Sequence, residues 1–223
     1  RLLAVYRYGL RHPGIDGEDG GGRLLVVVDA LSMATLRAAG PASVAARKGG
    51  LRVRMDTAHD LVRAADTHPV LTMTLMDTRE LLAGNDVLVD LSVEPADMRL
   101  RVEQALRGLR HELTDEFLFA PRNEVRVERV LRRTAGRLVY LLAGLLVVKG
   151  HMQLPERAGG LGGMGAILKV SEALLSSAEG ETLAALQSYA RHDVTVTGEG
   201  LFTLFAATLD LLGGLIQYAD THD

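Results

Sequence analysis

Tyr6-Arg7-Tyr8-Gly9-Leu10 opens the stretch of sequence that decides the fold. A loop from Arg11 to Gly20 follows it, and the run Gly21-Gly22-Arg23-Leu24-Leu25-Val26-Val27-Val28 comes next. The apolar and aromatic residues from Leu2 to Tyr8 predict a strand that ends at Gly9. Leu24 to Val28 is an uninterrupted run of Leu and Val, which predicts a strand buried on both faces. The glycines and the proline between the two strands predict a loop.

The overall composition sets the class of protein. The chain has 223 residues, 48% of them hydrophobic, and a formal net charge of -3. Its length and hydrophobic content are enough to build one large domain or two small ones. It has no cysteine, which excludes disulfides, a thiolate nucleophile and a cysteine-ligated metal, and favours a cytoplasmic location. The longest apolar run, Leu138 to Val148, is shorter than the roughly 20 residues that span a bilayer. We therefore expect no membrane anchor.

The segment after the second strand continues an α/β pattern. Leu31 to Lys48 is rich in alanine and predicts a helix. Leu51 to Met55 alternates apolar and basic residues, which predicts a strand whose polar face carries Arg52 and Arg54. Asp56 or Thr57 can cap a helix that runs to about Ala65. The pattern of Pro69 to Ala83 is compatible with either a helix or a strand.

From Pro95 onward the pattern is helical. Apolar residues recur at helical spacing over residues 96–120, and a second helix is expected from Asn123 to about Lys149. After a glycine-rich break from Ala158 to Gly165, three more helices are expected over residues 166–176, 181–191 and 199–219. The sequence therefore predicts an α/β + α protein: a small mixed sheet with flanking helices in residues 1–95, followed by an all-helical bundle in residues 96–223.

One side of the second long helix carries a stripe of arginines. Its members are Arg122, Arg126, Arg129, Arg133 and Arg137. Such a stripe is usually a solvated helix face, and here Glu124 and Glu128 stand at helical spacing to it. Binding of DNA, RNA or another anion to the stripe is the alternative.

The order of these elements resembles the nucleotidyltransferase superfamily, in the branch of minimal and kanamycin-type nucleotidyltransferases with a helical C-terminal domain. That family has a strand ending in Gly-Ser, ten residues, and then Asp-x-Asp opening a buried strand. Here Gly9 and Leu10 are followed by ten residues and then by Gly21-Gly22-Arg23. A Leu-Leu-Ala-Gly-Asn-Asp turn at residues 81–86 and the charged start of the helix at Asp97 also follow the family order. The resemblance covers nearly the whole chain by spacing and order.

The residues at the family's catalytic positions differ. The resemblance implies that a Ser contacts the nucleotide phosphates and that paired Asp residues hold two divalent ions. Leu10 stands in place of the Ser, Gly21 in place of the first Asp, and Arg23 in place of the second. The third acid belongs on the strand that matches Leu51 to Met55, whose polar residues are basic. Because arginine repels a metal ion, we expect no metal site and no catalytic residues.

These departures leave several functional hypotheses. The first is a catalytically inactive member that binds a partner or an anionic ligand, such as a nucleotide, a phosphate or nucleic acid, through the inherited cleft. Its expected anion-binding residues are Gly9, Gly21, Arg23, Arg52 and Arg54. The second is an active transferase that uses Mg²⁺ with a nucleoside triphosphate and acts on a small molecule or a protein, with its metal held by the loop acids Asp16, Glu18 and Asp19. The third is a nucleic-acid-associated protein.

The sequence leaves the oligomeric state open, and the last helix is the candidate for a contact between copies. The apolar stretch from Leu201 to Ile216 contains Gly213-Gly214, which allows close helix approach. A homodimer through this helix is a further hypothesis.

Overall fold

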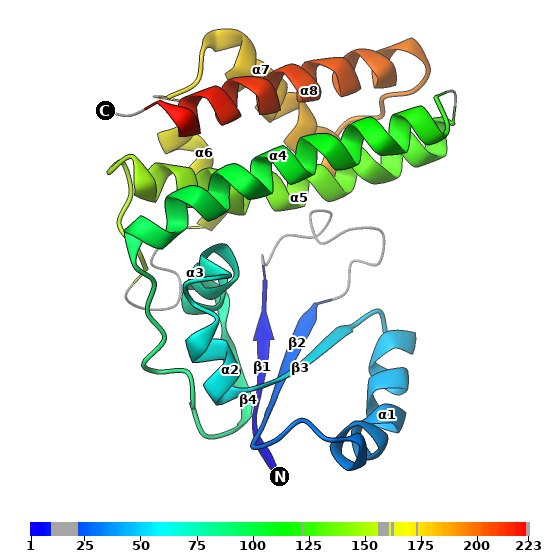
Figure 1. Ribbon diagram of the computed structural model, residues 1–223. Helices are drawn as coiled ribbons and strands as arrows, with labels where there is room; N and C mark the ends of the chain where they lie inside the picture. The colour runs from blue at the N-terminus through cyan, green and yellow to red at the C-terminus, as the bar shows by residue number, and fades with distance from the viewer. Residues whose placement is uncertain (10–21, 122, 156–160, 162, 173, 222–223) are drawn as a thin grey trace.

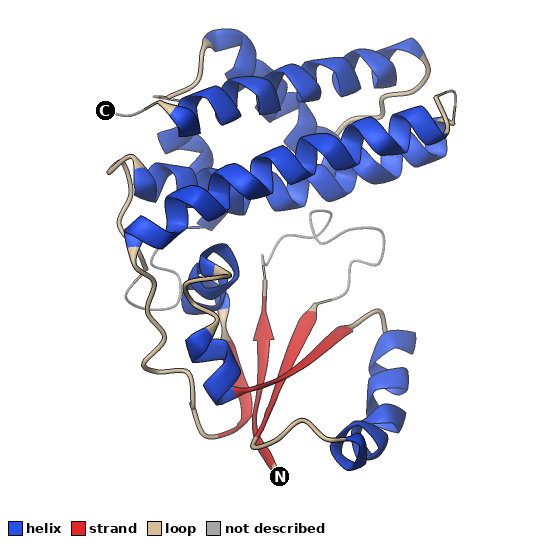
Figure 2. Ribbon diagram, in the orientation of Figure 1, coloured by secondary structure: helices blue, strands red, loops and turns tan. Residues whose placement is uncertain are grey.

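A computed structural model describes residues 1–9, 22–121, 123–155, 161, 163–172 and 174–221. It has a four-stranded sheet with three nearby helices at the N-terminal end, and a group of longer helices beyond it (Figure 1). All four described strands lie in the N-terminal part, and the described chain beyond them consists of helices and the loops that join them (Figure 2). The prediction of an α/β + α protein with a helical C-terminal region is therefore confirmed.

The sheet is mixed, and its strand order is β3-β2-β1-β4. β1 (Leu2–Tyr8) pairs antiparallel with both β2 (Arg23–Val28) and β4 (Glu80–Gly84), whereas β2 pairs parallel with β3 (Arg52–Thr57). The two central strands are the two that the sequence predicted on either side of the glycine-rich loop. The end of the sheet from which β2 and β3 start faces the helical region (Figure 1).

One face of the sheet is covered by two helices, α2 (Ala58–Arg63) and α3 (Pro69–Thr78). Their Leu61 and Leu75 are buried against Tyr6, Leu25 and Val27 of the strands. The side chain of Thr57 caps α2 by accepting a hydrogen bond from the N–H of Asp60 at 3.0 Å. This face forms the core of the N-terminal part, and it includes Leu88 and Leu91 from the connection to the bundle.

The opposite face is covered less completely. Its helix, α1 (Met33–Lys48), has no buried residue. Leu24 and Val26 point toward it and are only partly buried, while Leu25 on the other face of the same strand is fully buried. The expectation that β2 is buried on both faces is therefore wrong for this side, because the helix that lies over it presents only small side chains to the sheet.

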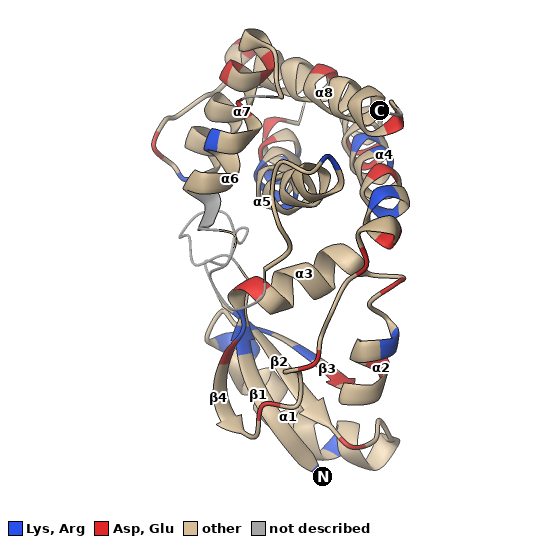
Figure 3. Cartoon of the chain, turned by 90° about the vertical axis from the view of Figure 1, so that its left-hand side faces the viewer, with Lys and Arg blue, Asp and Glu red and all other residues tan. Residues whose placement is uncertain are grey.

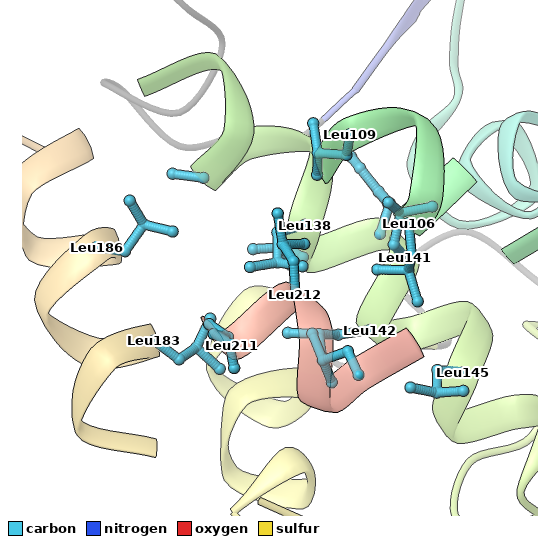
Figure 4. Close-up of a cluster of buried hydrophobic side chains, with 14 of the residues drawn as sticks. Leu106, Leu109, Leu138, Leu141, Leu142, Leu145, Leu183, Leu186, Leu211 and Leu212 are labelled. Atoms are coloured by element: carbon cyan, nitrogen blue, oxygen red, sulfur yellow. The ribbon is translucent and has the colours of Figure 1, made fainter. Parts of the chain in front are cut away.

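The helical region is built around α5 (Glu124–Val148), in which every residue from Leu138 to Val147 is buried. It packs against α4 (Pro95–Phe119), α6 (Gly163–Ser171), α7 (Ser177–Ala190) and α8 (Glu199–Asp220). Figure 4 shows leucines of α4, α5, α7 and α8 that point toward one another in this core. A helix that is apolar on nearly all sides is expected to lie at the centre of a bundle.

The two parts are joined through α3 and the segment that follows β4. Met73 of α3 and Val93 belong to the core of the helical region, and Met76 packs against both cores. The buried carboxylate of Asp77 accepts a hydrogen bond from the N–H of Leu161 at 2.9 Å, which ties the α5–α6 connection to α3. The division into residues 1–95 and 96–223 remains a prediction, since α3 contributes to both cores.

Most predicted elements occur within a few residues of their expected limits. The ambiguous segment from Pro69 to Ala83 contains both structures, first α3 and then β4, so the expected turn at residues 81–86 begins as a strand. α6 starts at Gly163, inside the predicted glycine-rich break. Pro95 is the first residue of α4, a position that tolerates proline because no N–H donor is needed there.

One described helix, α8, is long and apolar enough by length and composition to cross a membrane. Within this chain its Leu204, Leu211 and Leu212 are buried in the bundle core. Gly214 also packs inside the chain: a Cβ atom there would lie 2.0 Å from a carboxylate oxygen of Glu179 on α7. The close approach expected of Gly213-Gly214 is thus used between helices of one chain, and the homodimer remains a hypothesis.

Candidate functional site

Four glycine and arginine residues of the predicted anion site lie at the end of the sheet that faces the bundle. Gly9 ends β1, Arg23 begins β2, and Arg52 and Arg54 lie on β3. Figure 3 shows Lys and Arg residues gathered where the strands reach this end. Gly21 and the loop acids Asp16, Glu18 and Asp19 lie outside the described residues.

Gly9 has a backbone conformation that favours glycine, with φ at 101°. Its N–H donates a hydrogen bond to Oγ1 of Thr78 at 2.9 Å, and that hydroxyl donates to the carbonyl of Thr74 at 2.6 Å. The end of β1 is therefore attached to the end of α3. Sequence reasoning missed Thr78, because the only signal for it is its place on a helix whose position depends on the tertiary fold.

Arg23 and Arg52 are direct partners in the parallel register of β2 and β3. Paired residues of neighbouring strands point to the same face of a sheet, and the strands lie about 4.8 Å apart. Arg54, two residues along β3, pairs with Leu25 and therefore points to this face as well. The structure thus places the three predicted arginines on one face, as the alternation of β3 and its pairing with β2 required.

Arg54 is in an ion pair with a residue of its own strand. Its Nη2 atom lies 2.9 Å from Oδ2 of Asp56, and its Nε atom lies 3.3 Å from the same oxygen. The side chain of Asp56 is 16% exposed and that of Arg54 is 40% exposed. This pairing holds the guanidinium group beside β3 and satisfies part of its charge, so Arg54 has less capacity for an external anion than an unbound arginine would.

Asp56 changes the interpretation of β3. The sequence pattern predicts a strand that ends at Met55 and has only basic residues on its polar face. The strand instead continues to Thr57, so a carboxylate follows the two arginines on the same face. The alternation Arg52, Arg54, Asp56 is visible in the sequence, and extending the two-residue period by one step would have found it.

Among the described residues, no group of three or more His, Asp or Glu side chains is arranged to hold a metal ion. Gly22, just before β2, accepts a hydrogen bond from the N–H of Arg52 at 3.1 Å. A Cβ atom at Gly22 would make only ordinary contacts, at 3.6 Å from Leu51, so this position does not itself require glycine.

Two polar contacts hold β1 in place beside the site. Arg7 pairs with Glu80 of β4 at 2.5 Å. The buried Tyr6 hydroxyl donates to a carboxylate oxygen of Asp86 at 2.8 Å and accepts from the N–H of Val87 at 2.8 Å. Burial, together with the hydrogen bond to Asp86, raises the pKa of Tyr6 to about 12. Tyr6 therefore acts as a neutral hydrogen-bonding anchor for β1.

The arginine stripe of α5 faces acidic residues of α4. Arg133 lies 2.5 Å from Glu112 and 3.8 Å from Glu116, Arg137 also pairs with Glu112, and Arg126 lies 3.5 Å from Glu116. Arg129 belongs to the same helix, and Arg122 lies outside the described residues. The sequence suggested Glu124 and Glu128 as the partners, whereas these ion pairs join α5 to α4, because the two helices pack side by side. A phosphate group would therefore have to compete with Glu112 and Glu116 for these guanidinium groups.

A different arginine of α5 is buried. Nη1 of Arg132 donates to the carbonyls of Tyr189 at 2.8 Å and Ala190 at 3.1 Å, and its guanidinium group lies over the Tyr189 ring. These carbonyls belong to the last turn of α7, where a helix leaves acceptors without internal donors. Arg132 therefore fastens α7 to α5. Sequence reasoning did not separate it from the exposed stripe, since only the packing of α7 distinguishes it.

Comparisons with known proteins do not extend these observations. No protein-family model matches this chain, and none of the curated proteins matches it either. The N-terminal part is a small α/β sheet with flanking helices.

Proposed function

We propose that this protein is a catalytically inactive, nucleotidyltransferase-like protein that binds an anionic ligand at the bundle-facing end of its sheet. The observation that carries the proposal is the register of β2 and β3, in which Arg23 stands directly opposite Arg52. A phosphate or carboxylate lying across the two strands would accept charge-assisted hydrogen bonds from both guanidinium groups.

The layout around the arginines supports a ligand that approaches the backbone. Gly9 ends β1 beside Arg23, since Tyr8 is the register partner of Arg23. Family membership is also part of this proposal: a strand ending in glycine, a long loop, and an antiparallel neighbour with a parallel third strand fit the nucleotidyltransferase order. With Gly21 and Arg23 at the family's Asp positions, the strand lacks the carboxylates that align a triphosphate on metal ions. A cytoplasmic location is a further part of the proposal.

The direct test of the proposal is whether the protein binds a phosphate compound when no metal ion is present. Calorimetry with pyrophosphate and with ATP, each with and without Mg²⁺, should show binding that does not require the metal. Arg52→Ala should weaken it about tenfold or more, because each charge-assisted hydrogen bond contributes roughly 1.5 to 3 kcal/mol. Arg101→Ala removes the same charge from α4, where Arg101 bonds Gln104, and should leave affinity unchanged. Equal losses in both variants, or no binding to the wild-type protein, would refute the site.

A second candidate is an active, metal-dependent transferase, and Asp56 is the observation that favours it. Its carboxylate lies on the same face of β3 as Arg52 and Arg54. This activity would appear as Mg²⁺- or Mn²⁺-dependent transfer from labelled ATP, GTP, CTP or UTP that Asp56→Asn, Asp16→Ala or Asp19→Ala abolishes. We expect no such transfer, because Asp56 is in an ion pair with Arg54 and a guanidinium group opposes metal binding.

A further inference from the structure

The candidate anion site is only one residue pair deep along the sheet. Counted from the bundle-facing end, three pairs of neighbouring residues on β2 and β3 point to the same face: Arg23 with Arg52, Leu25 with Arg54, and Val27 with Asp56. Leu25 and Val27 are fully buried, because α2 and α3 cover the middle of this face. On β2, a ligand held by the first pair therefore has no room beyond Arg23.

On β3 the next cation is Arg54, whose side chain is 40% exposed. Residues two apart on a strand are separated by about 6.6 Å. A single phosphate or carboxylate held by Arg23 and Arg52 does not extend that far along the strand. A linear polyphosphate with one end at Arg52 would bring its later phosphoryl groups close to Arg54. Whether Arg54 is available to a ligand therefore decides which anions the site distinguishes.

Asp56 holds Arg54 against its own strand. Its Oδ2 atom accepts hydrogen bonds from Nη2 of Arg54 at 2.9 Å and from Nε at 3.3 Å. Its Oδ1 atom accepts a hydrogen bond from the N–H of Thr57 at 3.1 Å. Because both carboxylate oxygens are engaged and one of them is bound to the backbone, Asp56 stays in place and keeps the guanidinium group beside it.

The surroundings of this ion pair make it unfavourable to break. The side chain of Asp56 is only 16% exposed, and Val27, its register partner on β2, is fully buried. Water screens such a pair less than it screens a pair on an open surface. A ligand that took the guanidinium group of Arg54 would leave a mostly buried carboxylate without its ion-pair partner, which costs binding energy.

We propose that Asp56 determines the specificity of the anion site by keeping Arg54 out of ligand binding, so that the site takes a compact anionic end group. A terminal phosphate or a carboxylate fits Arg23 and Arg52, and a polyphosphate gains no contact with Arg54. Asp56 is thus a positioning residue that acts through Arg54. This inference rests on the proposed function and specifies which anions that site distinguishes.

The test compares inorganic phosphate with tripolyphosphate by calorimetry on the full chain, without metal ions and at physiological ionic strength. The wild-type protein should bind tripolyphosphate less than about tenfold more tightly than phosphate, because both use the same two arginines. Asp56→Asn releases Arg54 and keeps an acceptor for the N–H of Thr57, so it should raise the affinity for tripolyphosphate at least about tenfold. The affinity for phosphate should change less than about threefold, because Asp56 lies about 13 Å along the strand from Arg52, beyond the screening length of about 8 Å.

A matched control is the pair of Arg191 and Asp193 at the end of α7, in which Nε lies 2.9 Å from Oδ2. Asp193→Asn removes the same charge from the same arrangement and should leave both affinities unchanged, whereas adding Arg54→Ala to Asp56→Asn should abolish the gain for tripolyphosphate. Equal gains for both anions in Asp56→Asn, or none, would overturn the inference and leave the anion site standing. If Asp56→Asn does not fold, the wild-type ratio decides, and a ratio above about tenfold overturns the inference. If the wild-type protein binds neither anion, the proposed function fails together with this inference.

Discussion

Helices α1 and α5 show how differently the two parts of this protein are stabilised. α5 is buried without interruption from Leu138 to Val147, whereas α1 has no buried residue although it is also rich in apolar side chains. The difference lies in the neighbours: α5 has α4, α6, α7 and α8 around it, and α1 has one face of a sheet across a cavity. Buried residues are thus concentrated in the helical region, while apolar side chains of α1 and of one face of β2 stay partly exposed.

The largest expected effect that tests this contrast comes from leucine truncation. Leu142→Ala in α5, at a site 1% exposed, should lower the free energy of unfolding by about 2–5 kcal/mol because it leaves a cavity in a packed core. Leu36→Ala in α1, at a site 47% exposed, should change it by about 0.5 kcal/mol or less. Urea denaturation measures both. Similar losses in the two helices would show that α1 is packed far more tightly than the structure indicates.

A smaller effect is expected from the buried hydroxyl of the sheet region. Tyr6→Phe removes the hydrogen bonds to Asp86 and to the N–H of Val87 and should cost about 1–3 kcal/mol. Tyr8→Phe is the control, since it removes a hydroxyl from the same face of β1 without touching Asp86. An equal loss of stability in Tyr6→Phe and Tyr8→Phe would contradict the role of Tyr6 as the anchor of β1.

The Tyr6 contribution should also depend on pH with a defined sign. Its pKa is raised to about 12 in the folded protein, compared with about 10 in an unfolded chain. The neutral hydroxyl is therefore favoured by folding, and its contribution is complete below pH 10 and declines as the pH rises toward 12. The stability difference between wild type and Tyr6→Phe, measured across that range, should shrink. A constant difference would contradict the assigned pKa.

The smallest effect separates two glycines of the helical region. A Cβ atom at Gly144 of α5 would lie 2.8 Å from Cγ2 of Val102 and 3.3 Å from Sδ of Met98, so Gly144→Ala should destabilise by about 1 kcal/mol, the net of overpacking and improved helix propensity. Gly108→Ala in α4, where a Cβ atom meets nothing within 4 Å, should stabilise by up to about 1 kcal/mol. Thermal unfolding gives both signs. Stabilisation by both changes would mean that α4 and α5 separate easily at this point.

Much of the candidate site could be inferred from the sequence because strand periodicity is local. The alternation of Arg52 and Arg54 put both on one face of β3, and only the pairing with β2 was needed to bring Arg23 beside them. Asp56 was missed because the strand was predicted to end at Met55, whereas it continues to Thr57. Thr78 and Arg132 could not be found in this way, since each contacts a residue more than fifty positions away.

The sequence by itself determined the order of most strands and helices, the α/β + α class, and the position of the arginines along β2 and β3, but it left the segment of α3 and β4 open. These depend on hydrophobic periods of two and 3.6 residues and on glycine and proline, all of which act over a few neighbouring residues. Only the tertiary structure decided which side of β2 is covered. The run from Leu24 to Val28 is equally apolar on both sides, so burial depends on the side chains of the helix opposite: Leu61 and Leu75 fill one face, and the alanines of α1 leave a cavity on the other.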